Sequence, residues 1–353
     1  MKGKGKEKEM KPITVLSLFD GISCGQVALE RAGIPVAKYY ASEIDKSAIT
    51  ITMKNYPDTI QLGDVTKWRE WDIDWASVDL LIGGFPCIDV SVAGKQRGLE
   101  GKHSGLFYQY VDILNHIRSL NPNIKFLVEN VKMRKEFESV ITSYLGVEPV
   151  EINSNLLSAQ NRRRLYWTNW DFKVPEDKGI LLEDIVHEYK DNMSQEDLKD
   201  YIVPFSDTLK ILDKEVERGK IGYFGKDSQA NRVYSIHGKA VTLCGSAGGG
   251  AAKMGQYLFG CITPDRISQR QNGQRFNDGN KFYTLTAQDR HGVLIDGYIR
   301  KLTPVECERL QNLKDNYTNV PNVSETQRYK ALGNGWTVDV IAHILNTLVV
   351  DFE

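Results

Sequence analysis

The first 170 residues alternate short apolar runs with amphipathic stretches, and this rhythm limits the possible folds more than any other feature. The apolar runs have the length of buried strands, and the stretches between them carry apolar residues at helical spacing. Strands are predicted at 13–18, 37–41, 60–62, 78–82 and 124–128, and helices at 25–32, 47–55 and 106–120. The alternation predicts a doubly wound, mostly parallel α/β sheet whose ligands bind at the carboxyl ends of the strands.

After residue 170 this rhythm gives way to short β-like runs separated by Gly, Asn and Asp. Between residues 218 and 301 there are 13 Lys and Arg against 5 Asp and no Glu, together with 14 of the 30 glycines. Residues 171–217 carry a compensating excess of negative charge, with 14 acidic against 6 basic residues. A glycine-rich basic region is typical of a surface that binds a polyanion, although on charge alone a solvated β-rich domain is slightly favoured.

Regular structure is predicted again near the C-terminus. A helix at 303–313 has Thr303 as N-cap and Pro304 at its first position, and a last helix is predicted at 338–350. Because the last helix is apolar at helical spacing, we expect it to pack back on the first domain. The predicted organisation is a flexible charged tail at 1–11, an α/β domain formed by 12–170 and 331–353, and a smaller, irregular β-rich domain at 171–330.

The composition is that of a soluble globular protein, with 41% hydrophobic residues, 26% charged residues and a net charge of −1. No apolar run approaches the roughly eighteen residues of a membrane-spanning helix, and the charged N-terminus lacks the apolar core of a secretory signal. The five cysteines are scattered, without a CxxC pair or zinc-ligand spacing. We therefore expect no disulfide scaffold, no metal and no membrane, in a reducing cytoplasmic setting.

Three acidic residues mark the ends of the first three predicted strands. Asp20 lies in the glycine turn at 19–25, Glu43 follows the second strand 23 residues later, and Asp64 follows the third. Glycine lets the backbone approach a ligand closely, and a carboxylate at the end of the second strand is placed to accept hydrogen bonds from ribose hydroxyls. Asp64 could hold an adenine amino group. Each acid alone is more often a turn residue or a helix cap, but the three together favour an adenosine-type pocket.

Cys87 follows the fourth predicted strand, in the run GGFPC at 83–87. A free cysteine is usually a small buried hydrophobic residue, but its position after a proline at the ligand edge favours a nucleophile. The next segment, 93–105, contains four glycines and the basic residues Lys95, Arg97 and Lys102. A mobile basic lid beside a cysteine suits an anionic polymer that must be enclosed during a reaction.

Glu129 ends the fifth predicted strand, and three arginines follow it in the run QNRRRLYW at 160–167. A carboxylate that leaves a buried strand is costly unless it has a partner or a function. Alternate residues of an extended segment share a face, so Arg162 and Arg164 are expected to point the same way. A salt bridge from Glu129 to one of them is the structural interpretation, and it is compatible with a catalytic role.

These motifs resemble those of the DNA (cytosine-5) methyltransferases, a family that uses S-adenosylmethionine. Six of the family's motifs occur in order across nearly the whole chain: FDGISCG at 19–25, FPC at 85–87, ENV at 129–131, QNRRR at 160–164, RKLTPVECERLQ at 300–311 and LGNGW at 332–336. The chain departs from the family at three places. Ile88 stands where Gln is usual, Ser23-Cys24 where Gly-Gly is usual, and Gly335-Trp336 where Ser-Val is usual.

The resemblance implies a Rossmann-like S-adenosylmethionine-dependent methyltransferase domain and a target-recognition domain at 171–330. It implies methyl transfer to C5 of a cytosine that is flipped out of a specific double-stranded DNA sequence, with S-adenosylhomocysteine as the second product. Cys87 would add to C6 of the base, and Glu129 would contact N3 and the exocyclic amine. Arg164 would bind O2, and Arg162 would contact backbone phosphate or the lid.

The resemblance also assigns contacts residue by residue. The expected cofactor contacts are Phe19, Asp20, Gly21, Ile22, Gly25, Glu43, Ile44, Asp64, Val65, Phe85, Pro86, Leu106, Asn334 and Trp336. The expected DNA contacts are Ser91, Lys95, Arg97, Gln160, Arg232, Arg270, Arg275 and Arg290. The expected state is a monomer in the cytoplasm, associated with the nucleoid or in the host cytoplasm if the gene is viral.

Two alternatives to a DNA methyltransferase stay open. The same fold and motifs could act on cytosine in tRNA, although the large basic region favours DNA. A catalytically impaired DNA-binding homologue is the second alternative, and Ile88 is the residue that keeps it open.

Overall fold

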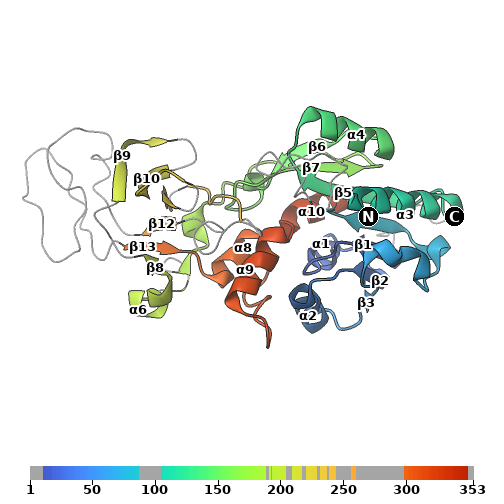
Figure 1. The fold of residues 1–353 in the computed structure, drawn as a ribbon, viewed down its shortest axis with the longest axis horizontal. Coiled ribbons are helices and arrows are strands. Elements are labelled where there is room, and N and C mark those ends of the chain that lie inside the picture. Colours follow the sequence, from blue (N-terminus) through green and yellow to red (C-terminus); the bar gives the residue numbers. More distant parts are fainter. Residues whose placement is uncertain are drawn as a thin grey trace, which may run out of the picture.

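The computed structural model describes residues 11–86, 105–187, 191, 193–203, 209–216, 220–228, 231–236, 238–243, 256–259 and 298–348. Within these ranges the chain forms a seven-stranded sheet with helices on both faces and a separate six-stranded sheet (Figure 1). The strand order of the larger sheet is β3-β2-β1-β4-β5-β7-β6, and that of the smaller sheet is β8-β13-β12-β11-β10-β9. The predicted α/β class, with a smaller β-rich part, is confirmed.

The larger sheet and its helices follow the predicted rhythm closely. Its strands are β1 Ile13–Leu18, β2 Val36–Ser42, β3 Ile60–Gln61, β4 Leu80–Gly83, β5 Lys125–Val131, β6 Val150–Asn153 and β7 Arg163–Thr168. Its helices are α1 Cys24–Arg31, α2 Lys46–Asn55, α3 Leu106–Leu120, α4 Lys135–Leu145 and α10 Val338–Leu345. The five strands predicted from apolar runs and the three helices between them are all present.

Strands β1 to β5 are parallel to one another. Strand β7 pairs antiparallel with β5 on one side and with β6 on the other. The sequence did not predict this antiparallel pair. Strand β7 begins with Arg163 and Arg164, so its first residues lack the apolar run that marks a buried strand. The pairing sets Val131 opposite Arg164, which brings the arginine to the end of β5.

Side chains of the sheet alternate between two apolar clusters, one on each face. On one face Val15, Ile82 and Leu127 pack with α1 and α10, and on the other face their neighbours along the strands pack with α3 and α4. Asp45 begins α2 by accepting hydrogen bonds from the N–H groups of Ser47 and Ala48. Both faces of the sheet are thus covered, and its strand ends are left for ligands.

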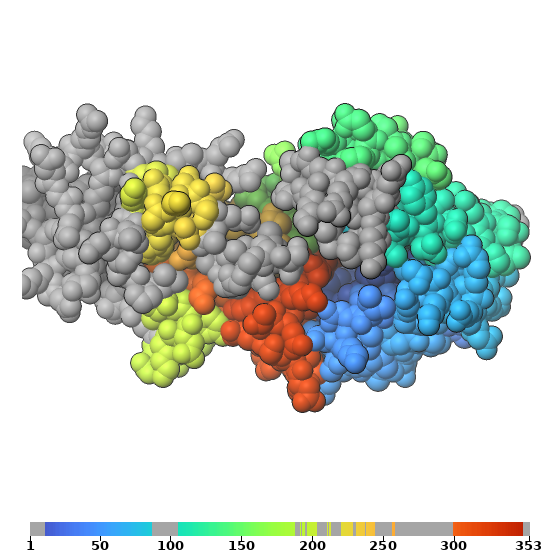
Figure 2. Space-filling view, in the orientation of Figure 1, coloured from blue at the N-terminus to red at the C-terminus, as the bar shows by residue number. Residues whose placement is uncertain are grey.

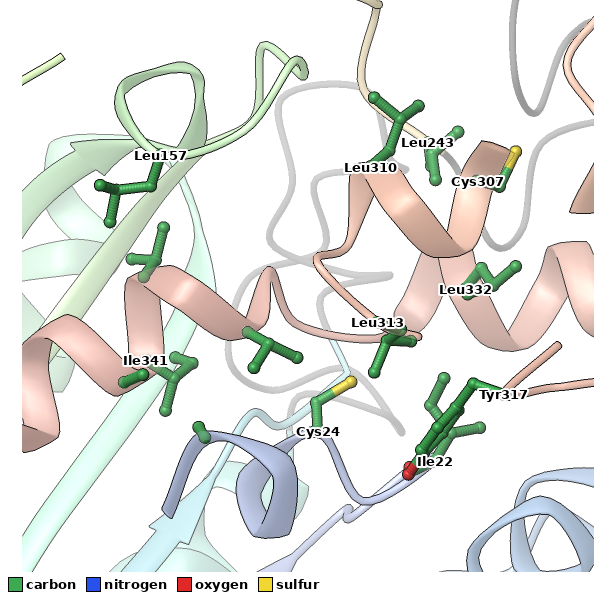
Figure 3. Packing of buried hydrophobic residues seen from close by; sticks show 14 of the residues in the cluster. Ile22, Cys24, Leu157, Leu243, Cys307, Leu310, Leu313, Tyr317, Leu332 and Ile341 are labelled. Atoms are coloured by element: carbon green, nitrogen blue, oxygen red, sulfur yellow. The ribbon is translucent and has the colours of Figure 1, made fainter. Parts of the chain in front are cut away.

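The C-terminal helices connect the two sheets. They are α8 Pro304–Leu310, α9 Glu325–Asn334 and α10, and they form the red segment between the yellow-green second sheet and the blue N-terminal strands in Figure 2. Thr303 caps α8 and Pro304 occupies its first position, as predicted. In Figure 3, Cys24 of α1 points toward Leu313, with Ile22 and Tyr317 beside them. The last helix packs against α1, which confirms that it returns to the first domain.

The second sheet consists of short strands. They are β8 Ile202–Val203, β9 Leu209–Val216, β10 Lys220–Phe224, β11 Arg232–Ser235, β12 Gln256–Phe259 and β13 Tyr298–Lys301, beside the short helix α6 Gln195–Leu198. All pairs are antiparallel except β11 with β12. No helix in the described part of the chain is both long and apolar enough to cross a membrane. The predicted domain limits stay a prediction.

Candidate active site

The carboxyl ends of β1, β2, β4 and β5 meet at one edge of the larger sheet, because these strands are parallel neighbours. The glycine turn follows β1, Glu43 follows β2, the GGFP segment begins at the last residue of β4, and Glu129 lies near the end of β5. The sequence prediction that these groups gather at one edge is therefore confirmed.

The turn after β1 has an unusual backbone. Phe19, Gly21 and Ser23 all have positive φ, at 57°, 60° and 55°. For Phe19 and Ser23 this conformation is strained, and such strain is found mainly where a ligand is held. Glu43 stabilises the turn, since its Oε2 accepts a hydrogen bond of 2.8 Å from the N–H of Gly21. The Glu43 carboxylate, directly after β2, therefore holds the turn in place at the carboxyl ends of the strands.

Asp20 is held inside this turn by two hydroxyl groups. The Tyr39 hydroxyl donates to Oδ1 at 2.8 Å, and the Ser23 hydroxyl donates to Oδ2. Desolvation raises the pKa of Asp20, although the bonds from Ser23, Ser17 and Tyr39 oppose the rise. Asp20 thus serves the turn itself, which is the structural role that a lone acid at a strand end usually has.

Ile44 directly follows Glu43 and is 72% exposed, the most exposed large apolar side chain among the described residues. An exposed isoleucine beside a strand-end carboxylate suits a flat ligand that covers it. Asp64 caps the turn that follows β3, because its Oδ1 accepts from the backbone N–H and the hydroxyl of Thr66. These hydrogen bonds lower the pKa of Asp64, and they leave its second oxygen for another donor.

The segment after β4 is anchored by the strand beside it. The Asn130 amide donates a hydrogen bond of 3.1 Å to the carbonyl oxygen of Phe85, and the Phe85 ring packs on Phe107 at 5.1 Å between centroids. Phe85 is buried, and Pro86 and Leu106 are half-buried on either side of residues 87–104, which lie outside the described part of the chain. Cys87, Ile88, Ser91, Lys95 and Arg97 lie outside the described residues.

Glu129 near the end of β5 is held from two sides. Its Oε1 pairs with Nε of Arg164 at 2.9 Å, and its Oε2 accepts a hydrogen bond of 3.0 Å from the indole Nε1 of Trp336. The Glu129 residue is 9% exposed. A buried carboxylate needs such partners to be stable, and this one has a fixed orientation. The expected salt bridge between Glu129 and an arginine is confirmed, and the partner is Arg164.

Arg162 lies buried among backbone carbonyl groups. Its guanidinium donates to the carbonyl oxygens of Leu243, Gly333 and Gly335 at 2.9–3.0 Å, and the residue is 4% exposed. The expected contact of Arg162 with phosphate or the lid stays a prediction, because residues 87–104 lie outside the described part of the chain. Gly333 lies in the last turn of α9, where carbonyl groups lack partners within the helix, and the buried guanidinium satisfies it.

Gln160 was expected to contact DNA, but it is fully buried. Among the described residues neither polar atom of its side chain has a hydrogen-bond partner, and in this conformation the amide does not reach the surface. Arg232 on β11 is partly exposed, and its Nε pairs with Asp227 at 2.7 Å. Arg270, Arg275 and Arg290 lie outside the described residues.

The other predicted cofactor residues are spread between surface and core. Asn334 at the end of α9 is exposed, Ile22 and Val65 are buried, and Gly25 lies inside the first turn of α1. An added Cβ on Gly25 would come within 2.6 Å of the Ile82 side chain and 2.7 Å of the Tyr39 hydroxyl. Gly25 is therefore required for packing as much as for a ligand.

Sequence reasoning missed several residues that support the site. The Tyr317 hydroxyl donates to the carbonyl oxygen of Ile22 at 2.7 Å, and Tyr39 holds Asp20. Asn130 was noticed only as part of a motif, yet it anchors the segment before Cys87. Trp336 was assigned to the cofactor pocket, and its bond to Glu129 was not foreseen. No local signal marks these contacts, since their partners lie 19 to 295 residues away.

The described residues contain no group of three or more His, Cys, Asp or Glu side chains arranged to hold a metal ion. The arrangement instead offers a strained glycine turn, an exposed apolar side chain between carboxylates, and a doubly held Glu129. This combination suits a reaction between a nucleoside-containing cofactor and a planar polar ring.

Comparison with known sequences gives a consistent result over almost the full length. The sequence model of the family described as C-5 cytosine-specific DNA methylase matches residues 13–349. The orphan methyltransferase M.SPRI of Bacillus phage SPR is 28% identical, over 96% of this chain and 98% of its own length. The type II methyltransferase M.HhaI of Haemophilus parahaemolyticus is 26% identical, over 96% of this chain and 95% of its own.

Solved structures share the fold. The methyltransferase EhMeth of Entamoeba histolytica superposes with a TM-score of 0.64 at 16% identity, over 95% of this chain and 97% of its own. The Dnmt2 methyltransferase of S. pombe gives 0.60 at 16% identity, over 94% and 97%. At this identity the likeness supports the α/β methyltransferase fold.

Proposed function

The chain belongs to the C-5 cytosine-specific DNA methylase family, and from this premise we propose that it methylates C5 of cytosine in a specific sequence of double-stranded DNA. Family and fold imply S-adenosylmethionine as the methyl donor. The proposal covers the substrate, the flipping of the target base, and a covalent bond between Cys87 and C6.

The observation that carries the proposal is the orientation of Glu129. Its two oxygens are held by Arg164 and Trp336, at the end of β5 and next to the segment that leads to Cys87. A carboxyl group fixed in this way is suited to bind the N3 and exocyclic amine edge of cytosine, which alternates an acceptor with a donor. An arginine beside it is suited to bind O2 of the same ring.

The strand-end residues fit an adenosine-containing cofactor. Ile44 offers an exposed apolar surface for a base, and the second oxygen of Asp64 is left for an amino group. Glu43 accepts hydrogen bonds from the N–H groups of Gly21, Ile44 and Asp45, and a carboxylate has capacity for one more donor such as a ribose hydroxyl. When bound, S-adenosylmethionine supplies the electrophilic methyl group that C5 takes.

Other residues of the proposed cofactor site act through backbone, packing or surface contacts. They are Phe19, Asp20, Ile22, Gly25, Val65, Phe85, Pro86, Leu106, Asn334 and Trp336.

Cys87 is proposed as the nucleophile, since C5 of cytosine is itself unreactive. Its thiolate adds to C6, the π electrons of the C5–C6 double bond shift to C4–C5, and those of the C4–N3 double bond go to N3, so that C5 becomes the nucleophilic carbon of an enamine. Glu129 donates or shares a proton at N3, and Arg164 stabilises the oxygen at C2. After methyl transfer, a base takes the C5 proton, the electrons of the C5–H bond re-form the C5–C6 double bond, and the C6–S bond breaks to expel the thiolate.

C6 cannot be reached inside a stacked duplex, so the target base has to be flipped into the site. The basic region around residues 218–301 is proposed to read neighbouring base pairs while its Lys and Arg bind phosphates. We propose that the chain acts as a monomer, and the phage and bacterial relatives support action in a bacterial cytoplasm.

The test is methyl transfer from labelled S-adenosylmethionine to duplex DNA of varied sequence, in parallel with transfer RNA, followed by nucleoside mass analysis. We expect 5-methylcytosine in DNA with the wild-type protein and none with Cys87→Ala, while Cys307→Ala, a change at a buried thiol elsewhere, retains activity. Methylation of RNA alone would replace DNA with tRNA as the substrate. Cofactor binding without methylation of either would indicate a binding protein, and Ile88→Gln would then test whether activity returns.

A further inference from the structure

We infer that Trp336 is a positioning residue for Glu129, acting through its indole N–H. The inference rests on the proposed function and deepens it, because it assigns to the α9–α10 link a part in orienting the carboxyl group that contacts cytosine. Trp336 is not placed among the groups that touch the target base.

The geometry shows how the carboxylate is fixed. Arg164 approaches Oε1 of Glu129 from β7 at 2.9 Å, and Trp336 approaches Oε2 from the far end of the chain at 3.0 Å. One partner alone would let the carboxylate rotate about a single bond. Two donors on separate oxygens fix its plane, and each oxygen keeps one lone pair for the substrate.

Gly84 provides independent evidence that this contact is built into the fold. A Cβ on Gly84 would lie 2.9 Å from Oε2 of Glu129, closer than real Cβ atoms approach, and 3.1 Å from Nε1 of Trp336, which is tighter than most real Cβ contacts. The absence of a side chain at this position lets the segment that leads to Cys87 pass directly beside the hydrogen bond. The nucleophile segment and the Glu129–Trp336 pair are therefore packed as one unit.

The opposite side of the indole faces the cofactor turn. A Cβ on Gly25 would lie 3.8 Å from Cζ3 of Trp336, so the ring spans from α1 to Glu129. Two roles are thus possible for one side chain: an apolar wall of the cofactor site, and a donor to Glu129. The donor role depends on the N–H, whereas the wall role depends on the ring alone.

This difference defines the test. A tryptophan analogue in which sulfur replaces the indole N–H keeps the size and shape of the ring but cannot donate. We place this analogue site-specifically at position 336 and, as a matched control, at position 170, where the indole N–H donates to the backbone carbonyl of Ile344 at 3.2 Å. We then measure kcat, KM for DNA and Kd for S-adenosylmethionine.

At position 336 we expect kcat to fall about tenfold or more, with Kd for the cofactor unchanged within about twofold, because a displaced catalytic group slows the chemical step. At position 170 we expect all three constants to stay at the wild-type values. An unchanged kcat with the analogue at position 336, or a loss confined to cofactor affinity, would overturn the inference and leave Trp336 as a wall of the pocket.

A spectroscopic measurement gives a second readout that does not depend on turnover. We expect the indole N–H resonance of Trp336, assigned with Trp336→Phe, to shift upfield in Glu129→Ala while the other indole resonances stay in place. A resonance that does not respond would contradict the hydrogen bond. If the wild-type protein makes no 5-methylcytosine, the proposed function fails on its own, whereas the resonance still tests the pair.

Discussion

Arg300 and Glu306 form an ion pair in which neither side chain is exposed. Two parallel bonds join them, Nη1 to Oε2 at 2.8 Å and Nη2 to Oε1 at 2.7 Å. Arg300 lies on β13 of the second sheet and Glu306 lies in the first turn of α8, so the pair ties the two parts of the molecule together. Glu306 also accepts from the N–H groups of His187 and Thr303.

Removing the charge of Glu306 is expected to destabilise the protein strongly. Glu306→Gln removes the charged partner of the Arg300 guanidinium from a buried pair, which typically costs about 3–5 kcal/mol. The measurement is the free energy of unfolding from denaturant titration. The control is Glu325→Gln, at an exposed glutamate that accepts a hydrogen bond from the Tyr201 hydroxyl. This change is expected to alter the free energy of unfolding by less than about 1 kcal/mol. Equal effects of the two changes would contradict the structural role of the pair.

The Arg300–Glu306 pair also predicts that the stability of the protein depends on pH in the acid range. Burial opposes the ionisation of Glu306, but Arg300 and the surrounding N–H groups outweigh it and lower the pKa of Glu306 below its ordinary value. A carboxyl group with a lowered pKa adds stability above its ordinary pKa and loses it as the pH falls through the lowered pKa. The difference in unfolding free energy between wild type and Glu306→Gln should therefore shrink in the acid range. A difference that is constant down to the lowest measurable pH would refute this account.

Arg162 is expected to act on stability rather than on DNA affinity. Arg162→Met leaves the carbonyl groups of Leu243, Gly333 and Gly335 without their donor, at a cost of about 2–4 kcal/mol. Arg163→Met, at the neighbouring side chain that is 62% exposed, is the control and should change stability little. Thermal unfolding checks this. A normal melting temperature together with a weaker salt dependence of DNA binding would instead restore the phosphate contact first expected of Arg162.

Gly84→Ala is expected to abolish most activity without unfolding the protein. The added methyl group meets Oε2 of Glu129 at 2.9 Å, and a displacement of about 1 Å at a catalytic group lowers kcat about 100-fold. Gly238→Ala is the matched control, because nothing lies within 4 Å of a Cβ built there. Methyl-transfer rates and circular dichroism of the two variants are compared. Near wild-type kcat in Gly84→Ala would mean that the Glu129 region tolerates displacement.

Ile44→Ala is expected to weaken binding of S-adenosylmethionine about fivefold, since truncation removes about 1 kcal/mol of apolar burial from the complex. Because Ile44 is 72% exposed in the free protein, its loss should leave stability almost unchanged. Leu120→Ala, at an exposed residue at the end of α3, is the control for cofactor affinity. Calorimetric titration measures the dissociation constant of S-adenosylmethionine for both variants. Equal constants for Ile44→Ala and Leu120→Ala would exclude Ile44 from the cofactor site.

Much of the sheet and of the cofactor edge was predictable because both depend on local patterns. The buried strand Ile13–Leu18 is marked by its own apolar residues, and the turn that follows is marked by its glycines. The antiparallel strand Arg163–Thr168 was missed because a charged beginning hides its apolar remainder. The burial of Arg162 and Gln160 was not predicted, because a motif gives residue types and spacing but not which side chains become buried.

The sequence by itself determined the fold class, the order of the motifs and the strand ends at which the acidic residues gather, since periodicity and turn chemistry act over a few residues. Only the tertiary structure decided that Trp336 donates to Glu129 across 207 positions of sequence and that Arg162 satisfies carbonyl groups 81 to 173 positions away. The physical reason is that a buried charge takes whichever partner the packing brings within hydrogen-bond distance. Nothing in the local sequence specifies that partner.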